Sequence, residues 1–250
     1  MKIKIKSKKI KNKFIYGDIL ENKKAASLVV FLSGLSGSRE LPLFKKASSV
    51  FFKNGFSTLR FNFCNDSDDK HKEISSIEMK DLSFQVYVAE LKNIITNFGD
   101  KYSNIILVGH SFGAAIAVLF LGKFKKRTNL ILWEPTLLPW KKEWMEEDFI
   151  LNVKKKLYFS KNNDEILNKT FYKELIEVDT VNLFKLLNKK TCIIAAQNSA
   201  DEDAKKYFSK LKNKKSSEFF IIKKSDHLFS DKPSQKILFK KTLDFLKNAN

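Results

Sequence analysis

The sequence contains few cysteines and no long apolar segment. Cys64 and Cys192 are its two cysteines, which are too few for a disulfide scaffold, and two free thiols are typical of a reducing cytoplasm. No apolar stretch reaches the roughly 20 residues that a membrane-spanning helix needs. The first residues alternate lysine with apolar residues and lack the continuous apolar region of a secretory signal. We therefore expect a cytoplasmic protein without a membrane span.

Acidic residues are also scarce relative to basic ones. The chain has 28 Asp and Glu against 47 Lys and Arg, a formal net charge of +19. Such an excess can attract nucleic acid, an anionic membrane surface or an acidic ligand such as a coenzyme A ester. The lysines are spread along the whole chain, however, and form no basic stripe interleaved with aromatic residues. We expect a generally solvated lysine surface and no specific nucleic-acid binding; peripheral contact with an anionic surface is the alternative.

The hydrophobic content of 43% over 250 residues is enough for one complete core. Short apolar runs alternate with segments of helical periodicity, a pattern typical of a mostly parallel sheet with helices on both faces. The sequence thus predicts a single α/β domain over residues 1–250, with an antiparallel edge hairpin over residues 1–19 and a long helix over Ser75–Phe98. The runs that predict the further strands are Leu28–Leu32, Phe56–Phe63, Ile105–Val108, Asn129–Trp133, Thr191–Ala196 and Phe219–Ile222.

One stretch, Asn104–Gly122, has the features of a nucleophile elbow. The apolar run Ile105–Val108 suits a strand buried on both faces. Gly109–Gly113 follows it with the sequence GHSFG, which fits the pattern G-x-S-x-G. Glycines flank the serine in this pattern because a Cβ there would clash where a strand turns abruptly into a helix. Ser111 is therefore the candidate nucleophile.

A serine hydroxyl needs a base to take its proton, and histidine is the usual base because its pKa lies near neutrality. The chain has three histidines. His71 lies in a charged segment, and His110 is adjacent to Ser111 and is expected to point elsewhere. His227 follows the last predicted strand, as the chain order of serine, acid and histidine requires. His227 is therefore the candidate base.

The alternation of strand and helix breaks between residues 136 and 181. This segment carries several aromatic residues among many charged ones, which is typical of a small helical cap over the active edge of a sheet. We expect Trp140 and Trp144 to line a substrate pocket beneath such a cap. The alternative is that these aromatic side chains only pack the cap onto the body.

Together these features resemble the α/β-hydrolase superfamily. More narrowly, the sequence is similar to serine esterases related to cinnamoyl and feruloyl esterases and to monoacylglycerol-lipase-like (serine aminopeptidase-like) hydrolases. The resemblance rests on the elbow and on the Asp-His-Leu-Phe setting of His227, and it covers nearly the whole chain except about residues 138–169. It implies the α/β-hydrolase fold, with a mostly parallel central sheet and a small helical cap inserted at about residues 136–181.

The same resemblance implies an oxyanion hole. In the family, the backbone N–H groups that follow the first central strand and the nucleophile hold the oxyanion, which assigns Leu35 and Phe112 here. Two positions depart from the family pattern: Ser33 stands where histidine is usual, and Asn62 stands where aspartate is usual. The change at Ser33 leaves the backbone donor of Leu35 in place.

The third member of the triad should be a carboxylate that holds the imidazole tautomer and stabilises the imidazolium. The resemblance places it just after Thr191–Ala196, where Asp201 fits best and Asp203 comes next. The glycine that is usual in this loop is missing, so the register leaves both open. Glu134, directly after the preceding strand, is a third candidate, since some hydrolases take their acid from that position.

These parts predict a serine hydrolase that cleaves the carboxylic ester of a small molecule through a triad of Ser111, His227 and Asp201 and an acyl-enzyme intermediate. No cofactor and no metal is expected. An acyl-CoA thioesterase or acyltransferase would use the same triad and is the alternative. A non-catalytic binding protein on this fold is disfavoured because serine, histidine and acid are all present, although fold alone does not decide.

Overall fold

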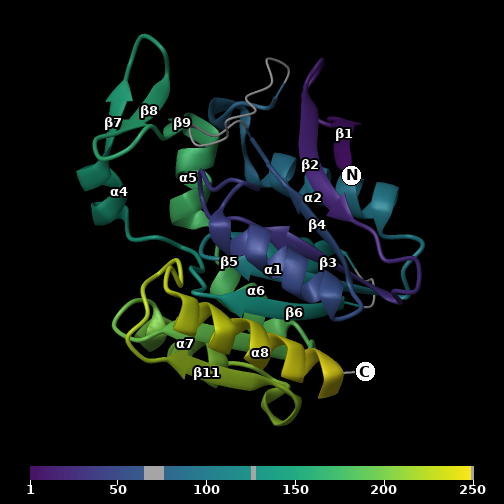
Figure 1. Ribbon diagram of the computed structural model, residues 1–250. Helices are drawn as coiled ribbons and strands as arrows, with labels where there is room; N and C mark the ends of the chain where they lie inside the picture. The colour runs from purple at the N-terminus through teal and green to yellow at the C-terminus, as the bar shows by residue number, and fades with distance from the viewer. Residues whose placement is uncertain (65–75, 125–127, 249–250) are drawn as a thin grey trace.

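The computed structural model describes residues 1–64, 76–124 and 128–248, and its centre is an eight-stranded sheet (Figure 1). Its strands are β1 (Lys2–Lys6), β2 (Phe14–Leu20), β3 (Ser27–Leu32), β4 (Ser57–Phe61), β5 (Asn104–His110), β6 (Thr128–Trp133), β10 (Thr191–Ala196) and β11 (Glu218–Ile222). They lie in the order β1-β2-β4-β3-β5-β6-β10-β11. β2 runs antiparallel to both β1 and β4, and the other neighbours are parallel. The predicted α/β class and the edge hairpin are confirmed.

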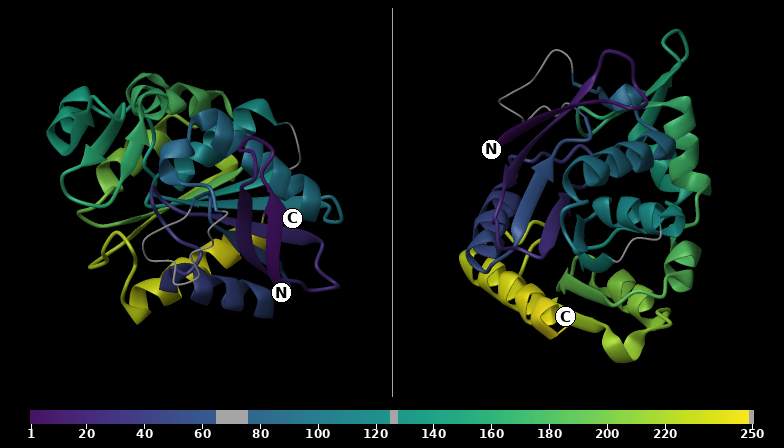
Figure 2. Two further views of the ribbon diagram at one scale, coloured as in Figure 1. Left: turned by 90° about the horizontal axis from the view of Figure 1, so that it is seen from above. Right: turned by 90° about the vertical axis from the view of Figure 1, so that its right-hand side faces the viewer.

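Helices cover both faces of this sheet, as Figure 2 shows in its right panel. The helices of the described residues are α1 (Pro42–Lys53), α2 (Phe84–Phe98), α3 (Gly113–Lys123), α4 (Lys142–Asp148), α5 (Lys169–Glu177), α6 (Thr180–Leu186), α7 (Asp201–Ser209) and α8 (Lys232–Asn248), with short 3₁₀ helices at Met79–Asp81 and Lys214–Ser216. α1 and α8 pack on one face, and α2, α3 and α7 pack on the other. Within the described ranges, every helix is too short or too polar to cross a bilayer.

Alternation along β3 explains how one apolar run serves two cores. Val29 and Phe31 pack with the side chains of α1 and α8, whereas Val30 and Leu32 pack with those of α2 and α3. All four are essentially inaccessible to solvent. Successive side chains of a strand point to opposite faces, so a strand covered on both faces must be apolar throughout. The fully buried core side chains thereby fix the carboxyl ends of β3, β5 and β6 side by side.

The long helix predicted over Ser75–Phe98 is shorter than expected. α2 begins at Phe84, because Ser83 adopts an extended backbone conformation and its Oγ accepts a hydrogen bond from Val86 N at 3.3 Å. This is an N-cap, which satisfies one of the free N–H groups of the first helical turn. Before it, the separate turn Met79–Asp81 is closed by a capping box between Glu78 and Asp81. The helical spacing of the apolar residues therefore extends past the true helix start.

The cap contains helices, as the sequence predicts, and also a small sheet that the sequence did not predict. β7 (Phe149–Asn152), β8 (Leu157–Ser160) and β9 (Ile166–Asn168) form a three-stranded antiparallel sheet beside α4 and α5, at the upper left of Figure 1. Strands of three or four residues are too short to show a period of two among so many lysines. Tyr158 of β8 stacks on Tyr172 of α5 with ring centroids 3.8 Å apart, which holds this small sheet against its helix.

Candidate active site

Ser111 lies at the sharp turn between β5 and α3. Its φ is +53°, a left-handed conformation that costs a non-glycine residue about 1 kcal/mol or more. The backbone on both sides is held: Ser111 N donates to Trp133 O at 3.0 Å, and Ser111 O accepts from Thr136 N at 3.1 Å and from Ala114 N at 3.0 Å. The neighbouring strand β6 and the first turn of α3 thus hold the strained residue and present its side chain beyond the sheet edge.

The two glycines of the elbow are required by close packing. A Cβ on Gly109 would lie 2.7 Å from Gly113 O and 2.8 Å from Ala114 N, and a Cβ on Gly113 would overlap the carbonyl oxygens of Leu32 and Ser33. Such distances are far shorter than ordinary contacts. The start of α3 therefore lies directly against the end of β3, as the G-x-S-x-G pattern predicts.

His227 follows β11, and its Nδ1 lies 3.1 Å from Glu134 Oε2. Glu134 is completely buried and comes directly after β6, with a φ of +48°. Its carboxylate accepts further hydrogen bonds from Ala196 N, from Ser199 Oγ at 2.6 Å and from Ala200 N at 3.3 Å. A buried carboxylate needs such donors. Here they hold the carboxylate so that Oε2 faces the imidazole of His227.

His110 packs against His227 and forms a hydrogen bond with its backbone carbonyl. Its Nε2 lies 2.9 Å from His227 O, and the two rings are 5.0 Å apart. A carbonyl can only accept, so His110 carries its proton on Nε2 and donates. Burial lowers the pKa of His110 to about 4, because the charged imidazolium would be desolvated. From the sequence, His110 was predicted to point away from the nucleophile, and its support of the His227 loop was not predicted.

The loop after β3 forms a turn against the nucleophile. Gly37 N donates to Gly34 O at 3.0 Å, and the hydroxyl of Ser33 donates to Gly37 O at 2.8 Å. A Cβ on Gly34 would be 3.5 Å from Ser111 Oγ. The N–H groups of Leu35, in this turn, and of Phe112, before α3, have no acceptor among the residues that the structure describes. Both are thus available to a ligand at Ser111.

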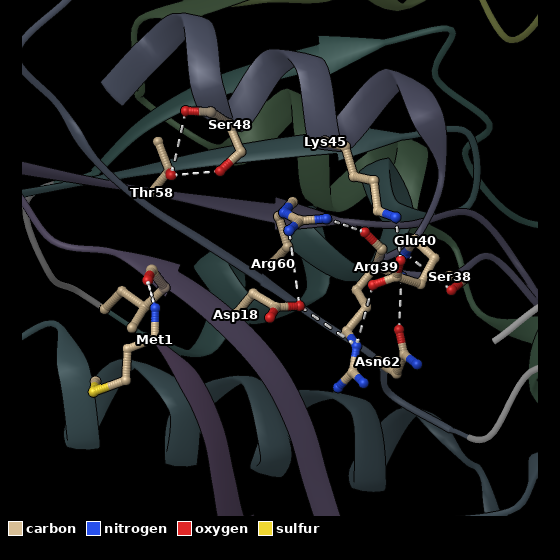
Figure 3. A network of polar contacts seen from close by, with 11 residues as sticks. Met1, Asp18, Ser38, Arg39, Glu40, Lys45, Ser48, Thr58, Arg60 and Asn62 are labelled. Carbon is tan, nitrogen blue, oxygen red and sulfur yellow. Dashed lines mark hydrogen bonds and ion pairs between the residues drawn. The ribbon is translucent and has the colours of Figure 1, made fainter. Parts of the chain in front are cut away.

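A polar network anchors the chain just after this turn (Figure 3). Arg39 N donates to Asn62 Oδ1 at 2.6 Å, and Arg60 Nη1 donates to Arg39 O. Both guanidinium groups also lie near Asp18 of β2, at 3.6 and 3.7 Å. The side-chain oxygen of Asn62 therefore accepts a hydrogen bond from the backbone of Arg39. The network ties the segment that carries Leu35 to β2 and β4.

Ser111 and His227 line one cavity of about 450 Å³, a volume within the usual range for small-molecule sites. Among the described residues, the structure contains no direct hydrogen bond between Ser111 Oγ and the His227 ring. Side chains from the body, the elbow and the cap complete the cavity. Its lining comprises Gly34, Leu35, Gly37, Leu41, His110, Ser111, Phe112, Thr136, Trp140, Trp144, Met145, Asp148, Phe149, Glu165, His227 and Leu228.

The acid chosen from the sequence does not fit the geometry. Asp201 is the first residue of α7, where its Oδ1 accepts from Asn198 N at 3.1 Å and its Oδ2 lies 3.4 Å from Lys205 Nζ. Asp203 is on the same helix and pairs with Lys206 at 3.1 Å. Both acids are explained by the helix terminus and its lysines. The carboxylate in contact with His227 is that of Glu134, the third candidate, because the chain leaves β6 in a left-handed turn that aims it at the histidine.

The two cap tryptophans both line the cavity but differ in burial. Trp140 is half-buried and packs on Phe112 with ring centroids 5.8 Å apart. Trp144 is 57% exposed, and Lys141 Nζ lies 4.8 Å from its ring centroid. Glu165, a cap residue that the sequence analysis did not single out, also lines the cavity. No sequence signal would have found it, since it is one of many charged residues in the cap.

No metal site emerges from the described side chains: none of their His, Cys, Asp and Glu residues form a group of three or more that could hold an ion. His71 lies outside the described residues. The groups that the described site offers are a serine hydroxyl, an imidazole, a buried carboxylate and two backbone N–H groups.

Comparisons with known proteins agree with this architecture at the level of the fold. No protein-family model matches the sequence, and no curated protein matches it. Among solved structures, the chain is similar to Est1E of Butyrivibrio proteoclasticus with ferulic acid bound, at 12% identity over 98% of each chain and a TM-score of 0.79. It is also similar to the alpha/beta hydrolase GrgF of Penicillium sp. sh18, at 12% identity over 99% of this chain and 98% of that chain, with a TM-score of 0.76. A dienelactone hydrolase of Anabaena variabilis matches at 11% identity over 99% of this chain and 96% of its own, with a TM-score of 0.65.

Proposed function

The chain has the α/β-hydrolase fold, and from its site we propose that it is a serine hydrolase that cleaves carboxylic esters of small molecules. The observation that carries the proposal is the joint placement of Ser111 and His227 on one cavity, with the His227 imidazole bonded to a buried carboxylate. The proposed triad is Ser111, His227 and Glu134, with Glu134 in place of Asp201.

The chemistry follows from these positions. With its Nδ1–H donating to Glu134, neutral His227 keeps an unprotonated Nε2, which takes the proton of Ser111 as its Oγ attacks the ester carbonyl carbon. The N–H groups of Leu35 and Phe112 stabilise the resulting oxyanion. When the ester C–O bond breaks, His227 returns the proton to the departing alcohol. Hydrogen bonds between such serines and histidines often tighten only when substrate binds.

Deacylation reverses the same path. Water loses a proton to His227 Nε2 and attacks the acyl carbonyl, and collapse of the second oxyanion releases the acid and restores the Ser111 hydroxyl. Glu134 remains ionised throughout and stabilises the imidazolium that forms twice in each cycle. Its four hydrogen bonds hold its orientation without rearrangement.

An acyl-CoA thioesterase or acyltransferase remains the alternative for the same triad. A coenzyme A ester carries several negative charges, so its site should offer cations. The cavity wall instead includes the carboxylates of Asp148 and Glu165, and no lysine or arginine is among its described lining residues. The positive charge of the chain as a whole is therefore not gathered in this cavity, so the described lining itself offers no Lys or Arg for the phosphates of a coenzyme A ester.

The first prediction tests the nucleophile. A fluorophosphonate probe should add one label at Ser111, located by peptide mass mapping, and hydrolysis of p-nitrophenyl acetate should disappear in Ser111→Ala. Ser209→Ala is the matched control, because Ser209 is an exposed hydroxyl on α7 that donates to Lys206 O, and it should keep both activities. An active protein that is not labelled, or labelling that persists in Ser111→Ala, would refute the proposal. Acyl-CoA substrates run beside the esters decide between the two substrate classes.

A further inference from the structure

The cap and the loop beside the nucleophile are joined by a partly buried polar contact. Ser36 Oγ lies 2.8 Å from Glu165 Oε1, across 129 positions of sequence. Glu165 precedes β9 and is held in place by its own backbone: Glu165 O accepts from Ser160 N at 3.0 Å, and Glu165 N donates to Asn163 Oδ1 at 2.9 Å. The cap therefore presents this carboxylate in a fixed direction toward the body.

Ser36 has a conformation that needs support. Its φ is +54°, in the turn closed by Gly37 N and Gly34 O, and a left-handed serine is disfavoured by about 1 kcal/mol or more. Its single hydroxyl proton has two acceptors in reach, Glu165 Oε1 and Leu35 O at 2.7 Å. A carboxylate is the stronger acceptor, so the proton is directed to Glu165. The contact thus opposes relaxation of the turn.

The turn formed by residues 34–37 lies directly against the side chain of Ser111. A Cβ at Gly34 would be 3.5 Å from Ser111 Oγ, and Leu35, the next residue, carries one of the two oxyanion donors of the proposed mechanism. Ser36 is bonded to Leu35 directly through the chain. The Leu35 N–H belongs to the Gly34–Leu35 peptide group, which lies in the turn that Gly37 N and Gly34 O close. A change in the Ser36 backbone alters this turn and with it the direction of the Leu35 N–H.

We propose that Glu165 is a positioning residue, which holds the Leu35 N–H in its oxyanion-binding direction through the hydrogen bond from Ser36. The inference rests on the proposed hydrolase function and deepens it. In this proposal the cap lines the pocket and also completes the oxyanion hole, through the contact of Glu165 with Ser36 in the turn. Burial also raises the pKa of Glu165, consistent with a carboxyl enclosed between cap and body.

The test uses p-nitrophenyl acetate, whose acyl group is too small to depend on the cap for binding. Removing one oxyanion donor lowers the kcat of serine hydrolases by about 100- to 1000-fold. A donor that points in the wrong direction should cause a smaller loss of kcat. We expect Glu165→Ala and Ser36→Ala each to lower kcat by about 10- to 100-fold with KM nearly unchanged, and to weaken a trifluoromethyl ketone inhibitor by a similar factor. Glu165→Gln retains an acceptor oxygen and should recover most of the rate.

Two controls separate positioning from general damage. The double variant of Glu165→Ala and Ser36→Ala should be no slower than either single variant, since both remove one hydrogen bond. Glu177→Ala removes another cap glutamate, which pairs with Lys173 on α5, and should keep wild-type kinetics. If Glu165→Ala fails to fold, Ser36→Ala carries the same prediction.

The outcomes distinguish this inference from the function on which it rests. Ser111-dependent hydrolysis that both single variants retain at the wild-type rate would overturn the inference alone, as would losses that multiply in the double variant. A wild-type protein without Ser111-dependent hydrolysis would overturn the proposed function, and the positioning role with it.

Discussion

The direction of a carboxylate side chain determines whether it can orient a histidine, and Glu134 and Asp201 differ in this respect: in the proposed triad the acid is Glu134, whose carboxylate lies against His227. Glu134 is fully buried and surrounded by donors from β10, the loop after it and His227. Asp201 is nearly as buried, at 8% exposed, yet its oxygens are used by Asn198 N and Lys205 at the start of α7. Burial alone would not separate the two; the identity of the donors does.

Exchange of each carboxylate for its amide should separate the roles. We expect Glu134→Gln to lower kcat for p-nitrophenyl acetate by roughly three to four orders of magnitude, because an amide cannot stabilise the imidazolium or hold the Nδ1–H tautomer. Asp201→Asn should retain near-normal kcat and lose about 0.3 to 1 kcal/mol of unfolding free energy, the usual value of an acid at a helix N-terminus. Steady-state kinetics and urea unfolding measure both. Near-normal turnover in Glu134→Gln would contradict the revised triad.

The sequence could predict the chain order of the triad but not this choice. The position of His227 after the last strand and of Ser111 in the elbow follow from local patterns. The acid has no pattern of its own, since any Asp or Glu at the carboxyl end of β6 or β10 satisfies the order. The sequence favours Asp201 because it follows the end of the strand Thr191–Ala196 and leaves room for one helix and one strand before His227. The left-handed backbone of Glu134, which turns its side chain to the histidine, leaves no mark in the sequence.

At the scale of helices and strands, the elements that could be predicted from the sequence are those with long and regular apolar patterns. β3, β5, β6 and β10 are strands of six or seven residues that each contain a continuous apolar run of four or five, so the body of the fold could be predicted from the sequence. The cap could not, because β7, β8 and β9 have only four, four and three residues. Such short strands are stabilised by contacts such as the stacking of Tyr158 on Tyr172, which involve residues distant in sequence.

The cap tryptophans allow a prediction about specificity. Trp140→Ala should shift the preferred acyl chain length, because the half-buried ring packs on Phe112 and forms part of the cavity wall. Trp144→Ala is the matched variant, and it should shift the preference less, since 57% of Trp144 is exposed. The measurement is kcat/KM for p-nitrophenyl esters from acetate to decanoate. Turnover of the acetate should survive in both; its collapse in a folded Trp140→Ala protein would mean that the ring supports the catalytic machinery itself.

At the scale of the whole molecule, the positive net charge of the chain is not found in the lining of the cavity at Ser111. It carries a formal charge of +19, whereas the described lining of the cavity bears carboxylates and neutral groups. Exposed lysines act over a Debye length of about 8 Å at physiological salt, so most of them are screened from the cavity. The groups of the proposed site are held instead by the hydrogen bonds that His227 makes with His110 and with Glu134. The burial of His110 also links the stability of the fold to pH.

The lowered pKa of His110 determines in which direction the stability of the fold changes with pH. Its folded pKa of about 4 lies below the value of about 6.5 that it has when unfolded, so between these pH values the unfolded chain binds the proton more readily. The contribution of neutral, buried His110 is therefore complete above pH 6.5 and is lost as the pH falls toward 4. A difference of this size corresponds to about 3 kcal/mol of unfolding free energy.

His110→Gln isolates this contribution from the rest of the molecule. The glutamine amide can still donate to His227 O but cannot titrate. Lysine repulsion and the other acidic groups change equally in both proteins, so urea unfolding at pH 7 and pH 4 should show the wild type losing about 3 kcal/mol more than His110→Gln. Equal losses in the two proteins would mean that His110 protonates in the folded state as readily as in the unfolded one. That result would contradict its enclosure beneath the His227 loop, and with it the rigid support that the proposed base requires.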